Sequence, residues 1–177
     1  NKKYIGVILG GHGLFTWGQS DKECYSRTIS VISMATRWLQ KNSKSKPFGK
    51  ILFKSYNKLK RKNIVTKIIP FIRSEISSLE NKISHFNDDN FVLEYVNSSN
   101  LKKLANVGTS CPDHFIRTKK RPVVLNFDPS MINEKQIKKQ LKSELEKYRK
   151  SYSNYYKKNK LSGSPKIRDS NPIIFLL

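Results

Sequence analysis

A histidine near the start of the sequence, His12, lies among glycines in the segment Gly10-Gly11-His12-Gly13. The apolar run Ile5 to Leu9 predicts a buried strand before it, and the glycines allow a tight turn that places the imidazole in a cleft. Imidazole is a frequent metal ligand, but a zinc site needs three or four donors, and no others lie nearby at ligand spacing. His12 is therefore either a metal ligand whose partners come from elsewhere or a structural hydrogen-bonding residue.

The same glycines do not form a nucleotide-binding motif. The pattern G-x-G-x-x-G fails because Thr16 stands where the third glycine is needed. A phosphate loop is excluded as well, since no G-K-[ST] ending follows. The glycines instead indicate a turn, in which Gly11 and Gly13 are the turn-forming residues.

A second candidate site surrounds His114, at the end of a predicted loop from Thr109 to His114. Four positive charges follow between Arg117 and Arg121, and arginine side chains with loop amides can hold a phosphate or carboxylate. Charge clusters beside strands are also common on surfaces, so a solvated basic turn with a structural contact between Asp113 and His114 is the alternative. The candidate residues of this anion or secondary site are Asp113, His114, Arg117 and Lys119.

A helix follows the glycine-rich turn. Ser20 and Glu23 form the S-x-x-E capping box, which predicts a helix from Asp21 to Lys41 or Asn42. Apolar residues recur at spacings of three and four, so we expect one broad face to pack against the sheet. That stripe comprises Tyr25, Ile29, Ile32, Thr36 and Leu39, widened by Cys24, Val31, Ala35 and Trp38.

The remaining chain alternates between helix and strand patterns, which indicates an α/β protein. Helices are predicted over residues 51–60, over the isoleucine-rich stretch 64–83 that Pro70 must kink or divide, over 100–106 before Gly108, and from 128–130 to 159. Strands are predicted over 91–96, 123–127 and 172–177. In the last helix, a narrow apolar face predicts a position on the outside of the fold; its residues are Ile137, Leu141, Leu145, Tyr148, Tyr152 and Tyr155.

The chain is strongly basic, with 35 Lys and Arg residues against 13 acidic ones and a formal net charge of +22. Only 8 of the 35 are Arg, the residue that base and bidentate phosphate recognition favours, and the lysines spread along the whole sequence. A coding bias explains this excess, so no specific nucleic-acid partner is expected. The two cysteines suggest neither a disulfide framework nor a metal site, and no signal peptide or apolar run of ~20 residues is present. We therefore expect a cytoplasmic protein without a membrane partner.

Together, these segments resemble class II aldolase/adducin-type domains. The stretch Gly6 to Gly18, followed by the helix that carries Glu23, Cys24 and Tyr25, is similar to their L-x-x-H-G-L-x-x-W-G segment. Residues 69–73 (Ile-Pro-Phe-Ile-Arg) and 108–122, with Thr-Ser-Cys-Pro-Asp-His, resemble further segments in the same order. Within the superfamily, the similarity is to the aldolase part of bifunctional rhamnulose-1-phosphate aldolase/short-chain dehydrogenase proteins.

The resemblance implies reversible cleavage of a phosphorylated ketose into dihydroxyacetone phosphate and an aldehyde, with Zn²⁺ or another divalent metal as cofactor. It gives His12 the role of one of three imidazole ligands. The other two ligands, the catalytic acid/base residue and the phosphate loop would lie upstream of this chain, so no catalytic residue is assigned. An NAD-dependent dehydrogenase half would lie downstream. The implied partner is a phosphorylated sugar, with homo-oligomer formation in the full-length parent.

The expected organisation is an incomplete class II aldolase-like α/β sheet with flanking helices, truncated at both ends. Residues 1–45 would be the C-terminal part of the metal-binding core, 46–170 its helical and α/β continuation, and 171–177 the start of a further strand. The absence of an initiator Met and the apolar final run lead to this expectation. The alternative is a non-catalytic, adducin-like binding module with a basic anion-binding surface.

Overall fold

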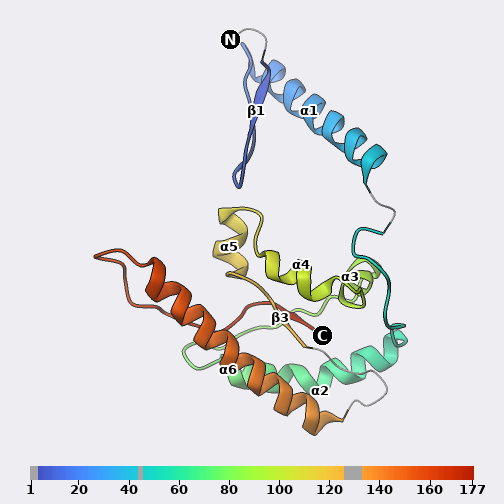
Figure 1. The fold of residues 1–177 in the computed structure, drawn as a ribbon, viewed down its shortest axis with the longest axis vertical. Coiled ribbons are helices and arrows are strands. Elements are labelled where there is room, and N and C mark those ends of the chain that lie inside the picture. Colours follow the sequence, from blue (N-terminus) through green and yellow to red (C-terminus); the bar gives the residue numbers. More distant parts are fainter. Residues whose placement is uncertain (1–3, 44–45, 126–132) are drawn as a thin grey trace. The chain divides into compact units, whose positions relative to one another are not determined.

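A computed structural model describes residues 4–43, 46–125 and 133–177 of the chain (Figure 1). The chain divides into two compact units, Asn1–Pro47 with Ser110–Ile116, and Phe48–Thr109 with Arg117–Leu177. The elements in chain order are β1 (Gly6–Leu9), β2 (Gly13–Thr16), α1 (Asp21–Asn42), α2 (Lys58–Ile76), α3 (Asn90–Val96), α4 (Leu101–Val107), α5 (Pro112–Thr118), β3 (Val123–Val124), α6 (Glu134–Asn159) and β4 (Phe175–Leu176).

The first unit begins with a β-hairpin. β1 and β2 are antiparallel, with Gly6 opposite Thr16 and Leu9 opposite Gly13, and the His12 amide donates to the Leu9 carbonyl at 3.1 Å across the turn. The sequence predicted a buried strand that leads straight into a helix. That prediction is wrong in two respects: β2 intervenes, and the side chains of Val7, Ile8 and Leu9 in β1 are exposed.

Helix α1 has the predicted bounds, because its signals are local. The Glu23 amide donates to Ser20 Oγ at 3.3 Å, and Glu23 Oε2 accepts from the Gln19 amide at 2.6 Å. Glu23 also pairs with Arg27 at 2.6 Å, and Arg27 donates to the Trp17 carbonyl at 2.9 Å. The capping box therefore also ties the helix start to the end of the hairpin.

The apolar stripe of α1 is largely exposed, which corrects the expectation that it packs broadly against a sheet. The helix contacts the hairpin near its own start, where Thr28 Oγ1 lies 2.5 Å from Thr16 Oγ1 and the Cys24 thiol faces the Thr16 carbonyl at 3.6 Å. Tyr25, Trp38 and Leu39 are each more than half exposed. A two-stranded hairpin is too small to cover a helix of 22 residues.

The second unit holds the hydrophobic core. α6 packs against α2 and against β3 (Figure 1). β3 pairs in parallel with β4, with Val123 opposite Phe175. Leu141 and Leu145 of α6 are fully buried, so each contributes about 1.5–3 kcal/mol of hydrophobic stabilisation. The narrow apolar face predicted for α6 is confirmed. The core residues are Ile68, Ile72, Ile76, Val123, Leu125, Ile137, Leu141, Leu145 and Tyr148.

The isoleucine-rich stretch forms a single helix that ends earlier than its pattern suggested. α2 runs through Pro70 and ends at Ile76, whereas Leu79 and Ile83 lie beyond it and are exposed. The helix predicted over residues 51–60 is wrong, because Ile51 forms a bridge to Ser98 and α2 starts only at Lys58, capped by Asn57.

Two short segments are helical in the structure, although the sequence predicted a strand and a loop. Residues 91–96 form helix α3 rather than a strand, and the rings of Phe91 and Tyr95 pack edge-on against Phe48 at 5.0 and 5.1 Å. The predicted loop before His114 contains the start of α5, with Pro112 at its first position, where the missing amide hydrogen costs nothing.

The observed architecture is mixed, mainly helical with few strands, and compatible with an α/β class II aldolase-like domain. α4 ends at Gly108 as predicted, with φ of 88° at that glycine. The predicted strand end at Phe127 and the helix start at 128–130 lie outside the described residues. Among the described residues, no helix combines the length and hydropathy that crossing a bilayer requires.

Candidate functional site

His12 lies in the exposed turn between β1 and β2. The backbone around it uses the left-handed region that favours glycine, with φ of 76° at Gly11 and 125° at Gly13. A Cβ atom added to either glycine would meet nothing within 4 Å, so there is open space beside both positions. His12 is exposed and therefore accessible to a ligand, and its backbone turn uses φ values that residues other than glycine rarely adopt.

His12 does not belong to a cluster of three or more metal-binding side chains among the described residues. Residues 4–43, 46–125 and 133–177 contain no group of three or more His, Cys, Asp or Glu side chains that could hold a metal ion. A stable zinc site needs at least three protein ligands. The donors present in the described residues therefore do not complete such a site, and His12 could supply one ligand of a centre completed elsewhere.

The second candidate site consists of three residues of α5 and of Lys119, which directly follows this helix. Asp113 lies in the first turn of α5 and Arg117 in its last, while His114 Nδ1 lies 2.8 Å from the Ser110 hydroxyl. Asp113 and His114 belong to the first unit, whereas Arg117 and Lys119 belong to the second. The sequence grouped the four residues by proximity along the chain.

Lys119 has a structural environment within the second unit. Its ammonium group donates to the carbonyls of Asp169 at 2.9 Å and Asn171 at 2.6 Å, and lies 3.6 Å from the Asp169 carboxylate. Burial lowers the pKa of Lys119, while the Asp169 carboxylate acts in the opposite direction. The residue also adopts φ of 59°, a region that non-glycine residues rarely use. The ammonium group of Lys119 therefore binds the segment before β4 and does not face solvent.

Asn171 extends this network into the core, and the sequence pattern gave no sign of it. The side chain is 6% exposed, accepts from Arg149 Nε at 2.7 Å and donates to the Ile76 carbonyl at 3.4 Å. Arg149 also donates to the Glu75 carbonyl at 2.6 Å. One asparagine therefore joins the end of α2, the middle of α6 and the approach to β4.

Comparison with known proteins identifies the family. The family model described as "Aldolase class II, second domain" matches residues 63–177, more than half of the chain. The chain belongs to this class II aldolase family. Class II aldolases are carbon–carbon lyases that generally depend on a divalent metal.

A relative in Bacillus subtilis (strain 168), described as "Uncharacterized oxidoreductase YuxG", is 31% identical over 172 residues. This match covers 97% of the chain but only 25% of the relative, so the chain spans about a quarter of the length of that protein. No solved structure matches the chain significantly. The comparisons therefore establish the family of this chain, and the activity of the complete protein is treated below as a proposal.

Proposed function

We propose that this chain is part of a metal-dependent aldolase that cleaves a phosphorylated ketose, such as rhamnulose 1-phosphate, into dihydroxyacetone phosphate and an aldehyde. The observation that carries the proposal is an accessible imidazole in a glycine turn of a class II aldolase family member. The similar Bacillus subtilis protein is about four times as long and is called an oxidoreductase. That description favours a bifunctional parent, and we propose an NAD-dependent short-chain dehydrogenase as its second half.

His12 is the one metal ligand that we propose within this chain. Zn²⁺ bound in such a centre supplies Lewis-acid stabilisation of the negative charge that develops on the substrate oxygens. The remaining ligands and the acid/base residue would come from other parts of the complete protein. The role of this chain is to present one imidazole on a turn whose positive φ values Gly11 and Gly13 allow.

The test begins with the coding sequence on both sides of this chain. The proposal expects an H-x-H segment upstream and a glycine-rich nucleotide-binding loop downstream. The complete protein, loaded with Zn²⁺, is then assayed for release of dihydroxyacetone phosphate from rhamnulose 1-phosphate and other ketose phosphates. The variant His12→Ala should lose at least about a hundredfold in activity and bind less zinc.

His85→Ala is the matched control, because His85 is also exposed but lies in the second unit. It should retain activity and metal content. A complete protein that binds zinc and cleaves substrate equally well with and without His12 contradicts the assignment. A complete protein that binds metal but cleaves no ketose phosphate favours the non-catalytic, adducin-like alternative.

The chain alone should bind zinc weakly and show no aldolase activity, because the described residues contain no group of three or more side chains that could hold the metal. Calorimetric titration of residues 1–177 with Zn²⁺ measures this directly. Tight, stoichiometric binding that survives His12→Ala would show that a different set of donors holds the metal.

A further inference from the structure

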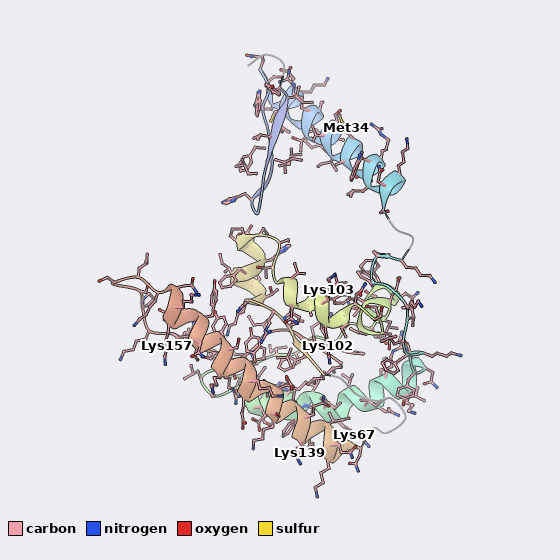
Figure 2. All side chains as sticks on the ribbon, in the orientation of Figure 1. Met34, Lys67, Lys102, Lys103, Lys139 and Lys157 are labelled. Carbon is pink, nitrogen blue, oxygen red and sulfur yellow. The ribbon has the colours of Figure 1, made fainter. Side chains whose placement is uncertain are left out.

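The second unit contains a cavity that the proposed aldolase chemistry does not use. It has a volume of about 180 Å³ and lies between α4, the segment leading into β3, and α6. Its polar lining residues are Lys102, Asn106, Arg121, Glu144, Lys147 and Tyr148. Figure 2 shows Lys102 on α4, beside Lys103.

The charges around this cavity favour an anion. Three cations and one carboxylate line it, which gives a net charge of +2. The carboxylate of Glu144 is paired with Lys147 at 2.7 Å, so the charges of Lys102 and Arg121 are those left to attract a ligand. Arg121 Nη1 donates to the Asn106 side-chain oxygen at 2.8 Å, which holds the guanidinium group in place and leaves its other donors for a ligand.

A buried donor lies in the same cavity wall. Tyr148 is 4% exposed, and its hydroxyl proton has no acceptor among the described residues, while the Arg121 backbone interacts with the hydroxyl oxygen. Burial raises the pKa of Tyr148 to about 12, neighbouring Tyr152 adds to the rise, and Arg121 opposes it, so the hydroxyl keeps its proton at neutral pH. An unsatisfied buried hydroxyl costs about 1–3 kcal/mol, and a ligand oxygen would relieve that cost.

We propose that this cavity binds a phosphate group, either as inorganic phosphate or as a small phosphate monoester. The net charge of +2 matches a phosphate dianion, and an arginine with free donors beside a lysine is the chemistry that recognises phosphate. The volume corresponds to about six water molecules, which leaves room for a phosphate and a few further atoms. The site is independent of His12 and of the proposed aldolase activity.

Titration of the chain with inorganic phosphate at constant ionic strength, followed by amide chemical shifts, tests the proposal. Saturable binding is expected, with shifts centred on α4, residues 121–124 and the part of α6 around Tyr148. Acetate at the same ionic strength should bind at least about tenfold more weakly, because it carries one charge instead of two. A phosphate monoester such as glycerol phosphate separates the two sources by binding more tightly than phosphate alone.

Neighbouring lysines on α4 provide a matched pair of variants. Lys102→Gln should weaken phosphate binding about fivefold, whereas Lys103→Gln, which removes the same charge outside the cavity, should leave it unchanged within about twofold. Arg121→Lys keeps the charge but loses the planar fork, and should weaken binding about tenfold. His12→Ala should have no effect, which keeps this test separate from that of the aldolase.

Two results would overturn the proposal. One is the absence of saturable phosphate binding up to about 10 mM, a dissociation constant that corresponds to roughly 2.7 kcal/mol of binding free energy. The other is an equal loss of affinity in Lys102→Gln and Lys103→Gln, since this would show attraction to the diffuse positive charge of the chain rather than to a site.

Discussion

Asn171 makes hydrogen bonds to several segments of the second unit through both its side chain and its backbone. Its side chain and backbone engage Arg149, Lys119, Asp169 and the Ile76 carbonyl, all within hydrogen-bond distance. Because the side chain is buried, its loss would leave Arg149 Nε and the Ile76 carbonyl without this partner in a region that excludes water, while the backbone bonds to Lys119 and Asp169 would remain. The side chain therefore stabilises the approach to β4.

Asn171→Ala should lower the free energy of unfolding by about 2–3 kcal/mol, since it leaves Arg149 and the Ile76 carbonyl without their partner. Urea denaturation followed by far-ultraviolet circular dichroism measures the change. Asn81→Ala, at an exposed position in a loop, is the control and should change stability by less than about 0.5 kcal/mol. Equal stability of both variants would show that the network contributes little.

The raised pKa of Tyr148 predicts that the protein loses stability at high pH. Its pKa is raised to about 12 in the folded state from 10.0, so the folded state holds a proton that the unfolded state releases. The associated stability is fully present below pH 10.0 and is lost as the pH rises towards about 12, a decrease of roughly 2–3 kcal/mol. Half-buried Tyr152 and Tyr95, whose pKa values burial also raises, add to this decrease.

Tyr148→Phe should therefore flatten the alkaline part of the stability curve with little destabilisation at neutral pH, because the hydroxyl proton has no acceptor among the described residues. Denaturation curves at several pH values, with tyrosinate absorbance recorded in parallel, measure this. Tyr25→Phe is the control, because Tyr25 is 69% exposed and should leave the slope unchanged. An identical slope in wild type and Tyr148→Phe would contradict the assignment.

At the level of elements, a glycine decides how α1 joins the hairpin. A Cβ atom on Gly18 would lie 2.5 Å from the Cys24 amide nitrogen, a backbone atom in the first turn of α1. The close approach allows the capping box of Ser20 and Glu23 to form directly after β2. The hairpin and the helix therefore pack through their junction, and less through the apolar stripe of α1.

Gly18→Ala should loosen this junction, because the helix start must move away from residue 18. Amide exchange in α1 and in the hairpin should become at least about tenfold faster, while exchange in α6 stays unchanged. Gly10→Ala is the matched control, since an added Cβ there meets nothing within 4 Å. Equal exchange rates in the two variants would show that the first unit tolerates the side chain at position 18.

The sequence allowed correct prediction of elements whose signals are local. The capping box sets the start of α1, Gly108 ends α4, and the apolar spacing in α6 identifies the face that forms the core. Five of the six residues from Phe91 to Val96 are apolar and fit a short strand as well as a buried helix, and the helix brings Phe91 and Tyr95 into contact with Phe48. Short runs of this kind depend on tertiary contacts that a single sequence does not display.

The candidate sites follow the same rule. The glycine turn around His12 was predictable because four adjacent residues define it, whereas its exposed position between the two strands of a hairpin was not. The cavity beside Tyr148 was not, because Lys102, Arg121 and Tyr148 come from three segments that only the fold brings together. For Lys119 the sequence suggested an anion site, because its neighbours along the chain are basic. In the fold its ammonium group instead binds the carbonyls of Asp169 and Asn171.

For the molecule as a whole, the two units differ in how much apolar surface they bury. α1 has no buried residue, whereas α6 contributes four buried side chains to the core. Local opening requires less free energy where fewer apolar contacts must break. The first unit by itself should therefore open far more often than the second.

Native-state hydrogen exchange of residues 1–177 should show amides of α6 around Leu141 and Leu145 exchanging at least about a hundredfold more slowly than amides in the second half of α1. The exposed face of α1, with Ile32, Trp38 and Leu39, is the reason for the difference. Measurement at two protein concentrations provides the control, because self-association through this face would slow exchange in α1 only at the higher one. Equal protection of both helices at the lower concentration would show that the apolar face of α1 is covered within a single chain.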